Sequence, residues 1–186
     1  MASLPVPMYT CPIESLRDLY VEQLRDLYNG ENQLCAALQE MARAATSMEL
    51  RSVFDNHLEA TRQHARRIES IFKEMDDSLW EKPSHAMLAL IDDCREIIEK
   101  KLDPILKDSA LVVAAQRVEH YEIAGYSCAY GFAKILGAPS AAKLLSTTLT
   151  EEIEAAKMLS IIAAKLSLRA NQGSNGRGRF ASLAAS

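Results

Sequence analysis

A chain of 186 residues, 48% hydrophobic and 25% charged, is long enough to bury the core of one globular domain. Its formal net charge of -4 gives no reason to expect a nucleic-acid partner, and no apolar run approaches the roughly 20 residues that a membrane span needs. The N-terminus lacks the basic and apolar regions of a signal peptide, and the four cysteines are too scattered for a disulfide framework. We therefore expect a cytoplasmic protein with free thiols.

The first half of the chain predicts two long helices. After an irregular N-terminal arm at 1–11, apolar periodicity predicts a helix over about 13–45, with Pro12 in its first turn. A capping-box pattern at 46–49 then begins a second helix, which ends near Met75. Glycine and proline are scarce and no strand pattern competes, so both segments favour an all-α protein.

The second half predicts one shorter helix and two more long ones. Ser84 and Ser109 are the expected caps, and Gly137 marks the stop between the last two helices. The predicted spans are 85–101 for the short helix, 109–136 and 139–169 for the third and fourth long helices, and 171–186 for a polar tail that is expected to be disordered. Four long helices with an additional short helix in the crossover predict an antiparallel four-helix bundle over residues 12–170.

Three of the four long helices carry glutamates in their apolar faces. On a helical wheel, Glu31 is central in the stripe of the first helix and Glu152 in that of the fourth. In the third helix Glu122 is central, and Glu119 lies at the edge of the stripe. Burying one ionised carboxylate without a partner costs several kcal/mol, so the group as a whole needs protons or cations.

Lysine and arginine do not supply those cations in the predicted arrangement. The wheel places the basic residues near the acids on outer helix faces: Arg25, Arg43, Arg67, Lys143 and Lys157. Inward carboxylates from several helices match the ligand set of iron or manganese, and such bundles can hold two ions. We therefore predict a metal site in the bundle core. For any single acid the alternative is a buried carboxyl group satisfied by hydrogen bonds, or a helix rotated so that the acid reaches water.

Two histidines of the second helix are candidate ligands beside these acids. His57 and His64 border the apolar stripe of that helix a heptad apart, whereas Glu59 points well away from it. His120 points outward from the third long helix, and His85 is expected at the surface. Only the first two histidines therefore join the predicted site.

Four segments of the chain carry a family resemblance: ESLRDLYVEQLRDLYNGENQL, HLEATRQHARRIE, AAQRVEHYEIAGY and AAKLLSTTLTEEIEAAKML. Together they resemble the YciE/YciF stress-protein family of the ferritin-like superfamily, over about residues 13–169. The resemblance implies an antiparallel ferritin-like bundle, a homodimer and a rubrerythrin-like di-metal site. It also implies a bacterial origin and a link to stress responses.

The ligand set that the resemblance implies can be placed on this sequence. Glu31 matches the single carboxylate of the first helix in ferritin-like sites, and His64 matches the histidine end of the second-helix ExxH motif. Glu119 and Glu122 match the third-helix ExxE motif of rubrerythrins, and Glu152 matches the glutamate of the fourth helix.

The sequence departs from that ligand set at two positions. Thr61 stands where the second-helix motif has a bridging glutamate, and Ala155 where the fourth helix has a histidine. His57 or water could complete the site, or the site could bind one ion or none.

Three functions follow from these alternatives. The first is a di-iron or iron–manganese carboxylate protein that reacts with O2 or peroxide. The second is a structural or binding protein of stressed cells, in which a metal only stabilises the fold. A ferritin-style storage cage is the third. None of them involves nucleic acid or a membrane.

Overall fold

The computed structural model describes residues 12–80 and 82–175 of the chain. Within these residues every regular element is a helix, so the predicted all-α class is confirmed. The predicted N-terminal arm and residues 176–186 of the predicted tail lie outside the described residues. The five helices are α1 (Leu16–Ala44), α2 (Met48–Met75), α3 (His85–Glu99), α4 (Pro104–Ile135) and α5 (Pro139–Asn175).

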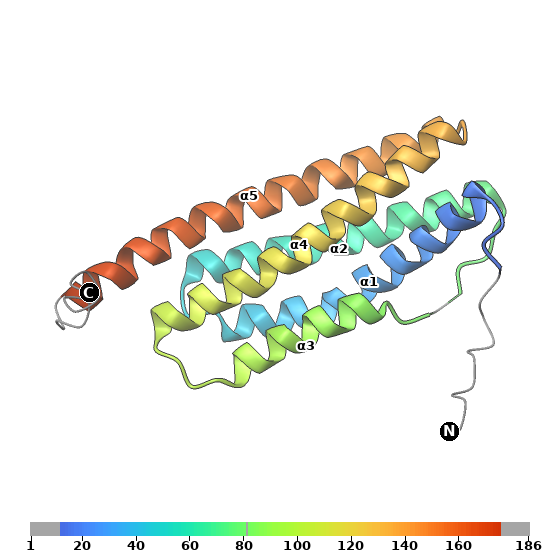
Figure 1. Cartoon of the computed structure of the whole chain (residues 1–186). Coiled ribbons are helices and arrows are strands. Elements are labelled where there is room, and N and C mark those ends of the chain that lie inside the picture. Colours follow the sequence, from blue (N-terminus) through green and yellow to red (C-terminus); the bar gives the residue numbers. More distant parts are fainter. Residues whose placement is uncertain (1–11, 81, 176–186) are drawn as a thin grey trace, which may run out of the picture.

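Four long helices pack side by side into a bundle, in which α1 and α5 run in one direction and α2 and α4 in the other (Figure 1). The most extensive packing joins α1 to α2 and α4 to α5, the two pairs that short turns connect. Contacts of α1 with α4 and of α2 with α5 join the two pairs. The short helix α3 lies in the connection from α2 to α4, as predicted, and packs against α1 and α4.

The apolar core consists of two clusters, one toward each end of the bundle, with a polar layer between them. In α1, Leu27 belongs to one cluster and Leu34 to the other, and Glu31 lies between them. In α4, Val118 belongs to the same cluster as Leu34, and Tyr126 belongs to the same cluster as Leu27. The buried acids and histidines therefore lie at mid-height, where helices from both halves of the chain converge.

Caps explain why two helices begin away from their predicted starts. α1 begins at Leu16 rather than near residue 13, because the Ser15 side chain accepts the Asp18 N–H. α2 begins at Met48 with Ser47 as its cap, so the capping box at 46–49 was placed one residue too early. The predicted end of α2 at Met75 is confirmed.

The predicted start of α4 at Ser109 is wrong. The Asp103 side chain caps the helix by accepting the N–H groups of Ile105 and Leu106, with Pro104 in the first turn. Ser109 lies inside the helix, and its hydroxyl donates to the Ile105 carbonyl. The preceding residue, Asp108, is buried and accepts two backbone N–H groups of the α1–α2 turn. The extra turn of α4 thereby holds the start of α2.

Gly137 ends the α4 segment, as the sequence predicted. Its φ of 70° lies in the left-handed region, which a residue with a Cβ adopts only at a cost. α5 begins two residues later, and it continues to Asn175 rather than ending near Arg169. The first five residues of the predicted tail, 171–175, are therefore helical.

Arg25 is buried, contrary to its predicted outer position. Its guanidinium lies over the Phe72 and Trp80 rings and donates to Asp77 and to a neighbouring carbonyl. The wheel placed Arg25 correctly on the side of α1 away from the acids, but the segment that follows α2 covers that side. Arg25 consequently anchors this segment and lies outside the polar layer.

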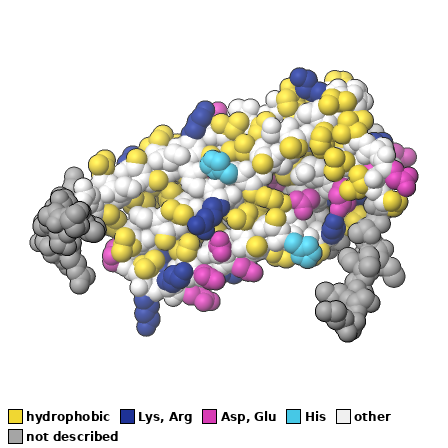
Figure 2. All heavy atoms as spheres, viewed as in Figure 1, with side chains coloured by type: hydrophobic (Ala, Val, Ile, Leu, Met, Phe, Trp, Pro, Cys, Tyr) yellow, Lys and Arg dark blue, Asp and Glu magenta, His cyan; other side chains and the backbone are white. Residues whose placement is uncertain are grey.

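The described surface is mixed in character. On the face shown in Figure 2, acidic and basic side chains are interspersed with hydrophobic ones. Hydrophobic side chains gather near the α4–α5 turn, where Ile135 and Leu136 are exposed. None of the described helices is both long and apolar enough to cross a lipid bilayer. Among the described cysteines, Cys35, Cys94 and Cys128 are free thiols.

Candidate metal centre

All six predicted ligand residues are buried in the polar layer between the two apolar clusters. α1 contributes one of them, α2 two, α4 two and α5 one. None of these side chains exposes more than 8% of its surface, so the helices hold them away from bulk water. The six are Glu31, His57, His64, Glu119, Glu122 and Glu152.

The six side chains form two adjoining groups that share Glu152. One group contains His57, Glu119, Glu122 and Glu152, and the other contains Glu31, His64 and Glu152. Within each group the potential ligand atoms all lie within 4.8 Å of one another, so one ion could contact all members of a group.

The two oxygens of Glu152 face different histidines. Oε1 lies 2.7 Å from His64 Nδ1, whereas Oε2 lies 3.8 Å from His57 Nε2. His64 Nδ1 also lies 3.5 Å from Glu31 Oε1, and His57 Nε2 lies 3.2 Å from Glu119 Oε1. Glu152 is thus placed between the two groups, as a bridging carboxylate would be.

These contacts are short but poorly aligned for hydrogen bonding. Among the described residues, the inward atoms His57 Nε2 and His64 Nδ1 have no hydrogen-bond partner of good geometry, nor has either oxygen of Glu122 or of Glu152. One oxygen of Glu31 and one of Glu119 also have no hydrogen-bond partner among the described residues. Buried polar groups are normally paired, and a cation surrounded by these atoms would satisfy them together. The residues present therefore fit a metal.

Without a metal, the buried acids hold protons more tightly than carboxyl groups in water. Burial raises the pKa of Glu31 to about 7, although the nearby His64 imidazole and the Tyr126 hydroxyl oppose the rise. Burial, reinforced by the charges of neighbouring glutamates, raises the pKa of Glu119 and of Glu122 well above 4.5. A bound cation would reverse this preference by favouring the ionised carboxylates.

The two histidines differ in their protonation. Burial lowers the pKa of His57, which favours the neutral imidazole. Burial also disfavours the charged form of His64, but contacts with Glu152 and Glu31 outweigh that effect and raise its pKa to about 10. The metal-free centre is therefore asymmetric, with the positive charge on His64.

Tyr126 of α4 supports Glu31 from the second apolar cluster. Its hydroxyl, fully buried, donates a hydrogen bond to Glu31 Oε1. Burial raises the pKa of this phenol well above 10, so it remains a donor at neutral pH. The hydroxyl of this packing residue therefore supports a candidate metal ligand.

Two side chains beside the centre were missed by the sequence interpretation. Glu151 Oε2 lies 2.9 Å from His64 Nε2, on the outer side of the imidazole. Arg67 donates to both oxygens of Glu151 and is half-buried, with a side-chain exposure of 16%. The prediction that Arg67 lies on an outer face was therefore wrong. The spacing of Arg67 three residues after His64 could have indicated this, because such residues neighbour each other on a helix.

The two departures from the implied ligand pattern leave no ligand at Thr61 or Ala155. Thr61 is fully buried one turn after His57, and its hydroxyl has no hydrogen-bond partner among the described residues. Ala155 lies half-buried on α5, where no side-chain ligand is available. His57 brings an imidazole to the group that would otherwise contain only Glu119, Glu122 and Glu152.

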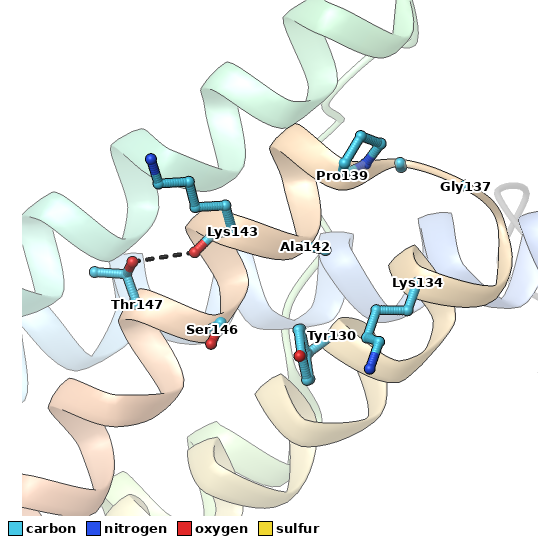
Figure 3. A pocket seen from close by; sticks show the side chains of 9 residues that line it. Tyr130, Lys134, Gly137, Pro139, Ala142, Lys143, Ser146 and Thr147 are labelled. Carbon is cyan, nitrogen blue, oxygen red and sulfur yellow. Dashed lines mark hydrogen bonds between the residues drawn. The ribbon is translucent and has the colours of Figure 1, made fainter.

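A separate surface groove of about 480 Å³ lies at the α4–α5 turn (Figure 3). Tyr130, Lys134, Lys143 and small residues line it, and the side chain of Lys134 lies over the Tyr130 ring. It contains no histidine or carboxylate, so this groove is not part of the candidate centre.

The fold and the centre define an all-α bundle protein with a buried cluster of histidine and glutamate. The family described as Domain of unknown function (DUF892) matches residues 15–171, and this chain belongs to that family. Protein YciF of Escherichia coli K12 is 38% identical over 141 residues, which cover 75% of this chain and 85% of YciF. The resemblance inferred from the sequence motifs is therefore confirmed.

Solved structures show the same fold. The crystal structure of the E. coli stress protein YciF superposes with a TM-score of 0.81 at 36% identity, covering 83% of this chain and 98% of that one. YcfI of Rhodopseudomonas palustris gives a TM-score of 0.78 at 33% identity, covering 82% and 98%. The protein XCC3681 of Xanthomonas campestris, at 20% identity and a TM-score of 0.68 over 87% and 99%, shares the fold alone.

Proposed function

We propose that this chain is a ferritin-like carboxylate protein of the bacterial stress response, which holds two iron or manganese ions and reacts with O2 or peroxide. The observation that carries the proposal is Glu152, whose two oxygens face two adjoining histidine–glutamate groups. Glutamate oxygens with imidazole nitrogens are ligands that suit iron and manganese. The antiparallel order of the four long helices, with α3 in the crossover, supports the ferritin-like assignment.

The residues would divide the work as follows. Glu31, His64 and one oxygen of Glu152 would hold one ion, and the other group would hold the second. When bound, the metal ions would supply the electrons that reduce the oxidant.

Neighbouring groups of the chain would support the ligands and control water. Tyr126 holds Glu31 in place through its hydrogen bond, and the apolar clusters on both sides exclude bulk water. Before metal binds, His57 and Glu119, whose nearest atoms lie 3.2 Å apart, can share a proton that metal binding would release.

The direct test is metal loading followed by oxidation. Protein produced with added iron or manganese and purified without chelator should contain two ions per chain by elemental analysis. The Fe(II)-loaded protein should be oxidised by O2 or peroxide, whereas Glu152→Ala should abolish this reaction. The matched control is Glu154→Ala, which removes an exposed carboxylate from the same helix. Metal-free protein from metal-replete cells would contradict the proposal.

A second candidate is a structural stress protein in which the metal only stabilises the bundle. Thr61 and Ala155 favour it, because each replaces a ligand that the ferritin-like pattern contains. A metal that binds only the folded state raises stability by mass action. A large metal-dependent rise in Tm, with no oxidation of Fe(II) by O2 or peroxide, would select this candidate.

We also propose a homodimer, as the family resemblance implies. The exposed apolar residues Met158 and Ile161 on α5, and the groove that Ile161 lines with Ile123, support a protein–protein contact. Light scattering after size exclusion should give twice the mass of the 20.6 kDa chain. The mass of a large shell would instead support a storage cage.

A further inference from the structure

Each ring nitrogen of His64 faces one of two adjacent glutamates of α5. Glu152 Oε1 lies 2.7 Å from Nδ1, on the side of the candidate centre. Glu151 Oε2 lies 2.9 Å from Nε2, on the opposite side of the ring. The two adjacent glutamates differ in exposure, since Glu152 is fully buried while the Glu151 side chain is 37% exposed.

Arg67 holds Glu151 in a fixed plane. Its Nη1 atom donates to Glu151 Oε2 at 2.6 Å, and its Nη2 atom donates to Oε1 at 2.9 Å. This two-pronged geometry fixes orientation as well as distance, because the guanidinium and the carboxylate are both planar. Nη1 also donates to the hydroxyl of Thr148, which is buried one turn earlier on α5.

The contact between His64 and Glu151 has a consequence for the inner nitrogen. An imidazole that donates its Nε2–H to a carboxylate presents Nδ1 as the atom available to bind a metal. The same hydrogen bond restricts rotation of the ring and increases the basicity of the ligating nitrogen.

We propose that Glu151, oriented by Arg67 and Thr148, is a positioning residue that fixes His64 with Nδ1 directed at the metal centre. The inference rests on the proposed function, since the direction of Nδ1 matters to the extent that this atom binds a metal. It adds three residues to the centre, none of which touches the metal. The interaction also links the centre to solvent, because Glu151 is its partly exposed end.

Affinity for a single metal ion gives the first test. Metal-free full-length chain is titrated with Mn2+ by calorimetry, comparing Glu151→Ala with the exposed control Glu154→Ala on the same helix. Loss of such an outer partner typically weakens metal binding by about 10–100-fold, so this loss is expected for Glu151→Ala alone. Arg67→Met should weaken binding less, because the carboxylate remains, and Glu151→Gln should restore part of the affinity because it keeps an acceptor oxygen.

A spectroscopic readout separates positioning from general destabilisation. Long-range 1H–15N spectra of the Zn2+-loaded protein should show His64 with Nδ1 bound to metal and a proton on Nε2. In Glu151→Ala the Nε2 proton should exchange faster with water, while His57 keeps its signals. Unchanged His64 signals together with unchanged Mn2+ affinity in Glu151→Ala would overturn the proposal.

The two proposals fail in different ways. If the wild-type chain binds neither Mn2+ nor Fe2+, the proposed function fails, and the metal-free protein then decides the positioning. The positioning role of Glu151 is supported if the His64 Nε2 proton is protected from exchange in the wild type and in Glu154→Ala but not in Glu151→Ala. Equal protection of this proton in all three proteins overturns that role. If Glu151→Ala does not fold, Glu151→Gln and Arg67→Met carry the same measurements.

Discussion

The imidazole rings of His57 and His64 lie 6.4 Å apart between centroids, with their planes at 72°. Their heptad spacing places them two turns apart on one side of α2, where each faces a different group of carboxylates. A single helix therefore supplies the only imidazoles of both groups among the described residues, and Glu152 on α5 joins the groups.

This arrangement predicts that each histidine can be removed separately. His57→Ala and His64→Ala should each lose one of the two bound ions, because each variant leaves the other group with its imidazole. Elemental analysis after loading and desalting measures the ratio of metal to protein. His120→Ala is the control, since this exposed imidazole donates its Nδ1–H to the Gln116 carbonyl and belongs to neither group. A full metal content in either site variant would contradict the two-group arrangement.

Raising the pH should destabilise the metal-free protein. The folded state raises the pKa of Glu31 from 4.5 to about 7 and that of His64 from 6.5 to about 10, and it raises those of Glu119 and Glu122. A raised folded-state pKa gives stability that is present below the unfolded value and lost as the pH rises through the folded value. The lowered pKa values of His57, Glu151, Asp18 and Glu49 act in the opposite direction, but of these only His57 is buried in the centre with the four groups whose pKa values are raised.

Urea unfolding with a chelator, at a series of pH values, tests this expectation. The free energy of unfolding should fall as the pH rises from 4.5, the ordinary pKa of a glutamate carboxyl, through about 7, the folded-state pKa of Glu31. Saturating Mn2+ should oppose the loss, because metal binding requires deprotonated ligands and strengthens as the pH rises. Metal-free protein that is most stable at the upper end of this range would refute the assignment of the proton-holding acids.

Periodicity was sufficient to predict the bundle and the inward acids. Apolar stripes at helical spacing are a property of each helix alone, so α1, α2, α4 and α5 could be recognised separately. Glu31, Glu122 and Glu152 interrupt those stripes, and each therefore had to face the core wherever its helix packed. His57 and His64 were placed at the border, and the structure buries both because α5 covers that side of α2.

The residues that were misplaced depend on contacts between distant segments. Arg25 becomes buried because Asp77 and Trp80 fold over it, a tertiary contact that a wheel of α1 does not contain. Arg67 is half-buried for a similar reason, since its partner Glu151 comes from α5. Helix starts failed where a local alternative existed: Asp103 and Ser109 are both good caps, and the choice between them depended on packing at the α1–α2 turn.

Two glycines of α4 provide a matched test of the close approach between α1 and α4. A Cβ at Gly125 would lie 2.7 Å from Leu27 Cδ2, a buried side chain, whereas a Cβ at Gly131 would meet nothing within 4 Å. Gly131→Ala should stabilise the protein by about 0.5–1 kcal/mol through helix propensity alone. Gly125→Ala should lose that gain and cost about 1–3 kcal/mol through overpacking. Urea unfolding that shows equal stabilisation by the two substitutions would contradict the packing described here.

The hydroxyl of Tyr126 should matter to both stability and metal binding. Tyr126→Phe keeps the buried ring but removes the donor to Glu31 Oε1, which leaves a buried carboxyl oxygen without this partner. Such a loss costs about 1–3 kcal/mol, so urea unfolding of the metal-free variant should show a reduction of that size. Tyr130→Phe is the control, because this half-buried ring on the same helix contacts Lys134 through its face.

Metal should reverse part of the loss caused by Tyr126→Phe. An ion bound by Glu31 would satisfy the oxygen that the substitution leaves unpaired, so the rise in Tm on adding Mn2+ should be larger in Tyr126→Phe than in the wild type. Thermal melts of both proteins, with and without Mn2+, measure this difference. An equal or smaller rise in the variant would mean that the ion does not replace the lost hydrogen bond.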